Sequence, residues 1–264
     1  MRGTSAASLQ SLLNVAEAQK TSEQLGDDLF NVVASIDSTP ALRRVLTDPS
    51  VESNAKEQLV ADVFGAHLSP AALAVVKDAV AGRWSAAGDL ADALEIAGVR
   101  TYVATAGEEG SETIQNELFA FGQVIAENAE LRDALTNRNY PATGKASLVR
   151  GVLGNKASAA SVALAAQAVA ARRANVNRTL AQFATIAADY RSRLVADVRV
   201  AFDLTESERT RLSAALAKKY GRAVHLNIAV DPEVVGGITV AIGDQTIDGS
   251  IASKLEDAKR RIAG

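Results

Sequence analysis

The first 190 residues carry apolar positions at three- and four-residue spacing, which is the period of an amphipathic helix. Two of these stripes are Leu25, Leu29, Val32 and Ile36, and Ile114, Leu118, Phe121 and Ile125. A third stripe runs from Val176 to Leu194 and predicts one long helix. After Leu194 the period changes to two, which is typical of strands. The pattern therefore predicts a helical region followed by a smaller region that contains a sheet.

The helical region repeats itself at an offset of 89 residues. Residues 29–65 align without gaps on residues 118–154, and 12 of the 37 positions carry the same residue, against roughly three expected by chance. The matched pairs include Lys56 with Lys145, Gly65 with Gly154 and, further along, Arg83 with Arg172. We therefore expect two antiparallel helical bundles that share the helix around residues 86–106.

Capping residues mark the helices of each copy. Ser53 is expected to cap a helix that Gly65 ends, and Ser69-Pro70 supplies a cap and a first-turn proline for the next helix. The second copy repeats this plan with Thr143, Gly154 and Ser158. Trp84, the only tryptophan, is expected to pack at a junction of the first bundle.

The region after the long helix alternates between strand and helix signals. A strand is predicted over residues 194–202, and a second over residues 224–230. Between them, Thr205 and Glu208 form a capping box, and Gly221 ends the helix that the box begins. The predicted order of elements is therefore strand, helix and strand, and a glycine-rich stretch follows them.

That stretch, DPEVVGGITVAIGDQTIDGSI over residues 231–251, contains two more alternating strands. Gly243-Asp244 lies between them, and glycine tolerates the positive φ of tight hairpin turns. Asp248-Gly249-Ser250 then leads the chain into a last helix, in which Leu255 faces inward. We interpret these glycines as turn residues that complete a β-α-β-β-β-α domain.

A phosphate-binding role for these glycines is disfavoured. Such a loop needs glycines between a strand and a helix, usually with a following lysine, whereas Gly236-Gly237 precedes a strand. TGKAS at residues 143–147 resembles a phosphate loop, but the upstream glycine is missing and Lys56, its repeat partner, has no glycine beside it. We interpret Lys56 and Lys145 as one shared structural position, a surface charge at the start of a helix.

The amino-acid composition disfavours several kinds of binding site and reaction. The net charge of −3 offers little attraction for nucleic acid, and the absence of cysteine removes disulfides and thiolate chemistry. The only two histidines, His67 and His225, are far apart in the sequence, so we expect no metal site, no catalytic residues and no cofactor. No apolar run is long enough to span a bilayer, so we expect membrane association only through partners.

The C-terminal stretch resembles the delta subunit of F-type ATP synthases, the family of the oligomycin-sensitivity-conferring protein. The resemblance is carried by Asp231, Gly236, Gly237, Gly243, Asp248, Gly249, Ser250 and Leu255. Residues 131–264 are similar to the family throughout, and Pro49, Val51, Lys56 and Gly82-Arg83 look like positions of its N-terminal helical domain. Usual members carry one helical bundle, so this chain resembles a long bacterial variety in which the bundle is duplicated.

The resemblance implies a non-catalytic stator subunit. Family members link the catalytic head, through its alpha and beta subunits, to the b subunit of the peripheral stalk, and so couple proton translocation to ATP synthesis. It also implies a peripheral position on the cytoplasmic face of the plasma membrane, as part of the complex. It leaves open which helical copy contacts the head, and whether the extra bundle stiffens the stator or reaches a longer b subunit.

Taken together, the sequence predicts a mainly α chain with a small α+β domain at its end. The expected domains are a first helical copy over 1–86, a second copy with its exit helix over 87–192, and the α/β domain over 193–264. The alternative is a free-standing helical scaffold that carries an α/β interaction module, in which case the signature glycines are a coincidence. A nucleotide-dependent enzyme is the third and weakest hypothesis.

Overall fold

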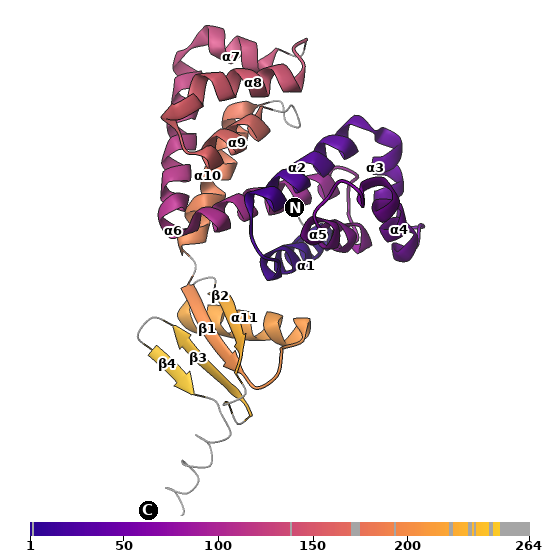
Figure 1. The fold of residues 1–264 in the computed structure, drawn as a ribbon, viewed down its shortest axis with the longest axis vertical. Helices are drawn as coiled ribbons and strands as arrows, with labels where there is room; N and C mark the ends of the chain where they lie inside the picture. The colour runs from indigo at the N-terminus through magenta and orange to yellow at the C-terminus, as the bar shows by residue number, and fades with distance from the viewer. Residues whose placement is uncertain are drawn as a thin grey trace, which may run out of the picture. The chain divides into compact units, whose positions relative to one another are not determined.

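Helices make up the chain as far as residue 192, and a small α/β unit follows. The computed structural model describes residues 1, 3–137, 139–169, 175–192, 194–221, 224–231, 234, 236–242 and 245–248. The helical part comprises α1 Thr4–Ala18, α2 Glu23–Ser38, α3 Pro40–Thr47, α4 Ser53–Phe64, α5 Pro70–Ala81, α6 Asp89–Glu127, α7 Ala129–Thr136, α8 Ala142–Leu153, a 3-10 turn Gly154–Lys156, α9 Ala159–Ala168 and α10 Val176–Ser192. The α/β part comprises β1 Leu194–Val200, α11 Glu206–Tyr220, β2 Val224–Val230, β3 Ile238–Ile242 and β4 Gln245–Asp248 (Figure 1).

The same 89-residue offset relates the helices of the two copies. It carries α3 onto α7 and α4 onto α8 with identical bounds, and it carries the start of α5 onto the start of α9. The first half of α6 serves both copies. It is the counterpart of α10 when it is counted with the first copy, and the counterpart of α1 when it is counted with the second. The duplication seen in the sequence is therefore a duplication of structure, and α1 belongs to it although no sequence identity indicated α1.

Helix α6 takes part in both copies, as predicted for the helix around residues 86–106. Its start places Leu90 and Leu94 in the core of the first bundle, and Val99 and Val103 in the core of the second. At Gly107 the φ angle is 73°, which breaks the helix, and the two halves run in different directions (Figure 1). This break corresponds in the repeat to the link between α1 and α2.

The predicted helix starts are right at some caps and wrong by one or two residues at others. The hydroxyls of Ser69 and Ser158 accept hydrogen bonds from the N–H groups of Ala72 and Ser161, as capping residues do. The prediction was wrong for Ser53 and Thr143: α4 already includes Ser53 after an N-cap at Glu52, and α8 begins at Ala142 after Pro141. In neither helix does a side chain cap the first turn, because the flanking residue is not a hydroxyl.

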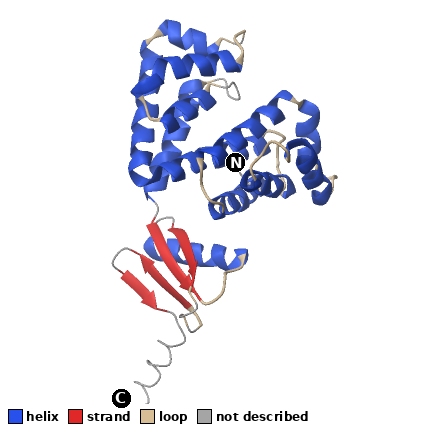
Figure 2. Cartoon of the chain, viewed as in Figure 1, coloured by secondary structure: helices blue, strands red, loops and turns tan. Residues whose placement is uncertain are grey.

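The α/β unit holds a four-stranded sheet in the order β2-β1-β3-β4. Strands β1 and β2 are parallel and joined through α11, whereas β3 and β4 are antiparallel to their neighbours. Figure 2 shows α11 lying along one face of the sheet. Its Leu216 packs in a cluster with Val198 and Val240, which are buried on that face. The capping box of Thr205 with Glu208 and the left-handed Gly221 at the end of α11 are confirmed.

Two predictions for this unit need comment. Strand β1 ends at Val200 instead of 202, and the Phe202 side chain is 84% exposed, because the chain leaves the sheet before it. The last helix and Leu255 lie outside the described residues.

The chain divides into two compact units, Met1–Tyr190 and Arg191–Gly264. The separate domains 1–86 and 87–192 stay a prediction.

Candidate functional site

Three of the signature residues, Asp231, Gly236 and Gly237, lie in the connection between β2 and β3. The N–H of Asp231 donates to the Val200 carbonyl at 2.8 Å, which fixes the end of β2 beside the end of β1. The Asp231 carboxylate lies 3.7 Å from the Arg199 guanidinium. Gly236 and Gly237 follow with φ angles of 67° and 89°, and only glycine adopts such angles readily. The geometry of this connection is that of a turn between two strands.

The remaining signature residues are only partly described. Ile242 pairs with Gln245, so β3 and β4 form the predicted hairpin, while its turn residues Gly243 and Asp244 lie outside the described residues. Asp248 ends β4 opposite Thr239. Gly249 and Ser250 also lie outside the described residues.

Lys56 and Lys145 occupy equivalent positions in α4 and α8, but the surface charge expected there is wrong. Their side chains are only 5% and 6% exposed, because each lies on the face of its helix that packs against the bundle. Burial lowers the pKa of the Lys56 ammonium, and the neighbouring Asp48 carboxylate opposes part of that effect. A lysine covered in this way is a packing residue with a long apolar stem.

The other repeat pairs serve the ends of helices. Gly65 follows α4 in a right-handed conformation, whereas Gly154 follows α8 with a φ of 34°, so both end a helix in different ways. The backbone of Arg83 is held by Ser8, whose hydroxyl donates to the Arg83 carbonyl at 2.8 Å and accepts from its N–H at 3.0 Å. Arg172, its repeat partner, lies outside the described residues.

A pair of carboxylates that the sequence analysis missed, of which Asp28 is buried and Glu117 is half-buried, fixes the same turn in both copies. The Asp28 carboxylate accepts from the backbone N–H of Ser69 at 2.9 Å, and the Glu117 carboxylate accepts from that of Ser158 at 2.9 Å. Asp28 and Glu117 are themselves 89 residues apart. The signal was therefore present as an acidic residue in each copy, but it is an Asp in one and a Glu in the other, so a search for identities passes over it.

In the first copy, α2 and α6 approach closely through two glycines. The rings of Phe30 and Tyr102 stack with centroids 5.7 Å apart, and each ring lies over the glycine of the opposite helix, Gly98 for Phe30 and Gly26 for Tyr102. The Tyr102 hydroxyl donates to the Asp27 carboxylate at 2.5 Å. Burial, followed by this contact, raises the pKa of Tyr102 far above its usual value, so the phenol stays protonated.

Trp84 packs against the core of the first bundle, as expected, and its indole N–H donates to the Ala79 carbonyl at 2.8 Å. Across the described part of the chain, no three His, Cys, Asp or Glu side chains are grouped so that they could hold a metal ion. None of the helices described there combines the length and apolar character needed to cross a bilayer. The features that the described residues bring together are turns, caps and packing contacts.

The chain is similar to known proteins along most of its length. The family model for the ATP synthase delta (OSCP) subunit matches residues 10–83 and 101–262. The ATP synthase subunit delta of Nocardioides sp. is 45% identical, and the alignment covers 100% of this chain and 98% of that protein. The protein of the same name from Beutenbergia cavernae is 38% identical, with 100% of both chains covered. These relatives therefore share the full length of the chain, including the second helical copy.

A search of solved structures found a chain of the mitochondrial ATP synthase hexamer of Toxoplasma gondii. It is 14% identical, covers 63% of this chain and 97% of its own, and gives a TM-score of 0.28, which is too low to carry an argument. The match of the family model to most of the residues, together with relatives that are aligned from end to end, settles the assignment. The chain belongs to the ATP synthase delta (OSCP) subunit family.

Proposed function

We propose that this protein is a non-catalytic stator subunit of an F-type ATP synthase, and that it links the catalytic head to the peripheral stalk. The observation that carries the proposal is the full-length similarity to proteins named ATP synthase subunit delta. The helical unit would contact the alpha and beta subunits, and the α/β unit would contact the b subunit. The protein would lie on the cytoplasmic face of a bacterial plasma membrane, held there by the complex.

The physical requirement for such a link is mechanical. Rotation of the central shaft exerts a torque on the head, and a head that is not tethered would turn with the shaft, so proton flow would no longer drive ATP formation. Two contacts of modest affinity that are made by one chain hold much longer than either alone, because the second contact forms at a high effective concentration. Each of the two compact units of the chain would make one of these contacts.

Purification of the complex tests the proposal. A tagged copy of this chain is expressed in its own host, membranes are solubilised in mild detergent, and the bound proteins are identified by mass spectrometry. We expect the alpha, beta and b subunits to be recovered together. Recovery of neither the head nor the stalk would refute the proposal and would support the free-standing scaffold instead.

The two contacts can be tested separately with chains altered in one unit only. Loss of b with retention of alpha and beta is the result expected when the α/β unit is disrupted, and Gly237→Val is a suitable variant because residue 237 has a φ of 89°. Loss of the head on disrupting that unit would assign the contacts the other way round.

A further inference from the structure

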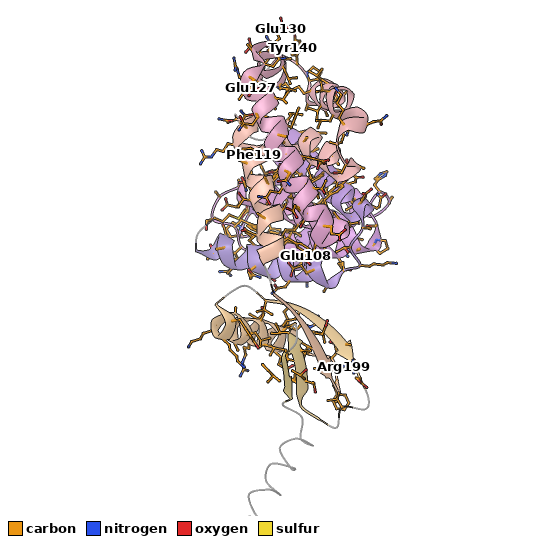
Figure 3. All side chains as sticks on the ribbon, turned by 90° about the vertical axis from the view of Figure 1, so that its left-hand side faces the viewer. Glu108, Phe119, Glu127, Glu130, Tyr140 and Arg199 are labelled. Atoms are coloured by element: carbon orange, nitrogen blue, oxygen red, sulfur yellow. The ribbon has the colours of Figure 1, made fainter. Side chains whose placement is uncertain are left out.

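The second half of α6 exposes a phenylalanine whose counterpart in the first copy is buried. Phe119 is 64% exposed, whereas Phe30, its partner at the 89-residue offset, is 8% exposed. Figure 3 shows Phe119 on α6 between Glu108 and Glu127. The same residue type is therefore buried in the first copy and exposed in the second.

The residues that cover the Phe30 ring in the first copy explain why Phe30 is buried and Phe119 is exposed. In the first copy the Phe30 ring stacks on Tyr102 and lies against Gly98, where an added Cβ would come within 2.5 Å of the ring. The offset places Ala187 at the position of Gly98 and Arg191 at the position of Tyr102. The second copy therefore lacks both the glycine and the aromatic partner that cover this ring, and it keeps the phenylalanine.

The surroundings of Phe119 are acidic. Residues 101–131 contain six glutamates, at 108, 109, 112, 117, 127 and 130, and no lysine or arginine; the guanidinium of Arg132, the next residue, reaches back and donates to the Ala126 carbonyl at 3.1 Å. A stripe at three- and four-residue spacing lies on one side of α6 and is called the Phe119 face: Glu108, Glu112, Gln115, Phe119, Gln123 and Ala126. Both carboxylates on this face belong to exposed residues, and exposed Glu127 lies at its margin.

We infer that the Phe119 face binds a basic amphipathic helix of a partner protein. The first copy already shows a helix packed on this position, since α6 covers Phe30 on α2. Acidic residues around one large apolar side chain complement a helix that carries an apolar stripe bordered by lysine or arginine. A second copy of this chain is a poorer occupant, because the chain has a net charge of −3 and its Phe119 face would meet another acidic surface. The inference does not depend on the proposed function.

The test uses the full chain and a synthetic probe. The probe is a fluorescein-labelled 18-residue peptide with leucines on one helical face and lysines on the other, and its binding is followed by fluorescence anisotropy. The variants are Phe119→Ser, Phe119→Leu and the pair Glu108→Gln with Glu127→Gln. The matched charge control is Glu52→Gln with Glu57→Gln in the first copy, and the matched apolar control is the exposed Phe202→Ser in the other unit.

We expect Phe119→Ser to weaken binding about tenfold and Phe119→Leu to restore most of it. The paired glutamine variant should weaken binding about threefold and reduce its dependence on salt, while both controls bind like the unaltered chain. Equal binding by Phe119→Ser, or loss of binding in the controls, would overturn the inference. So would self-association that sedimentation detects in the unaltered chain and that Phe119→Ser abolishes, because a second copy would then be the occupant.

Discussion

The crossing of α2 and α6 gives the sharpest test of how the helical unit is packed. Both Gly98 and Gly122 lie within α6 with helical backbone, so replacing either by alanine improves the intrinsic preference for helix. Their surroundings differ. A Cβ at Gly98 would lie 2.5 Å from Cε1 of Phe30, whereas a Cβ at Gly122 would meet no atom within 4 Å.

The two substitutions therefore isolate one energy term. Each gains about 1 kcal/mol of helix propensity when glycine becomes alanine. Gly98→Ala also overpacks a core in which the Phe30 ring is held by the stack with Tyr102, and overpacking costs about 1–3 kcal/mol. We expect Gly122→Ala to stabilise the helical unit by about 1 kcal/mol and Gly98→Ala to destabilise it by about 1 kcal/mol. The difference between the two variants, about 2 kcal/mol, is the overpacking term alone.

Equilibrium unfolding in urea measures this difference. Circular dichroism follows the helices, and the fluorescence of Trp84, the only tryptophan, reports the first bundle, against whose core it packs. A third variant, Gly98→Ala with Phe30→Leu, shortens the side chain that the new methyl group meets. A double-mutant cycle should show a favourable coupling between the two changes, since the leucine lacks the ring atoms in contact.

The reasoning fails if Gly98→Ala and Gly122→Ala change the free energy of unfolding by the same amount within about 0.5 kcal/mol. The close approach of α2 to α6 would then not exist in solution. If the two variants differ in stability but the double-mutant cycle shows no coupling between residues 98 and 30, the overpacking involves atoms other than the Phe30 ring.

Three further predictions concern single sites. Gly237→Val should lower the midpoint of unfolding of the α/β unit, because a β-branched residue is strained at a φ of 89°; an unchanged melting curve of that unit would contradict the turn. For Glu117, burial alone would raise its pKa, but hydrogen bonds from Ser161 and Ser158 outweigh burial and lower it. Its stabilisation is therefore present above the ordinary carboxyl pKa and is lost as the pH falls through the lowered value. Glu117→Gln should cost about 1 kcal/mol at neutral pH and nearly nothing in acid, as urea unfolding across pH will show, and a cost that does not vary with pH would refute this. Lys56→Met keeps the apolar stem and removes a buried ammonium, so it should raise the free energy of unfolding by up to about 1 kcal/mol; the gain should fade as the pH rises through the lowered pKa of Lys56, and a constant gain would point to packing alone.

Features with a local physical cause could be predicted from the sequence. The capping hydroxyls of Ser69 and Ser158, the capping box at Thr205 and the glycine that ends α11 each act within one turn of their own position. The alternation of apolar residues placed all four strands within two residues of their observed ends. The offset of 89 residues predicted the duplicated helices and the helix that both copies share.

Features that depend on contacts between distant segments could not be predicted in the same way. The burial of Lys56 and Lys145 follows from how α4 and α8 lie against their bundles, and a charged residue in the first turn of a helix gives no sign of it. The different exposure of Phe30 and Phe119 depends on what lies across from each ring, at Gly98 and Tyr102 in the first copy. Identity between the copies predicts an equal position in the helix, but not an equal environment.

The shared helix decides where the two copies can be separated. A cut after residue 86, the predicted edge of the first domain, removes Leu90 and Leu94, both fully buried in the first core. Burial of two leucines contributes about 3–6 kcal/mol, which is comparable with the 5–15 kcal/mol that stabilises a typical domain. We therefore expect residues 1–86 alone to unfold without a cooperative transition, and residues 1–106, which include the first half of α6, to unfold cooperatively in circular dichroism. Equal cooperativity of the two fragments would show that the first bundle is complete without α6, and that the copies are independent domains joined by a helix that neither needs.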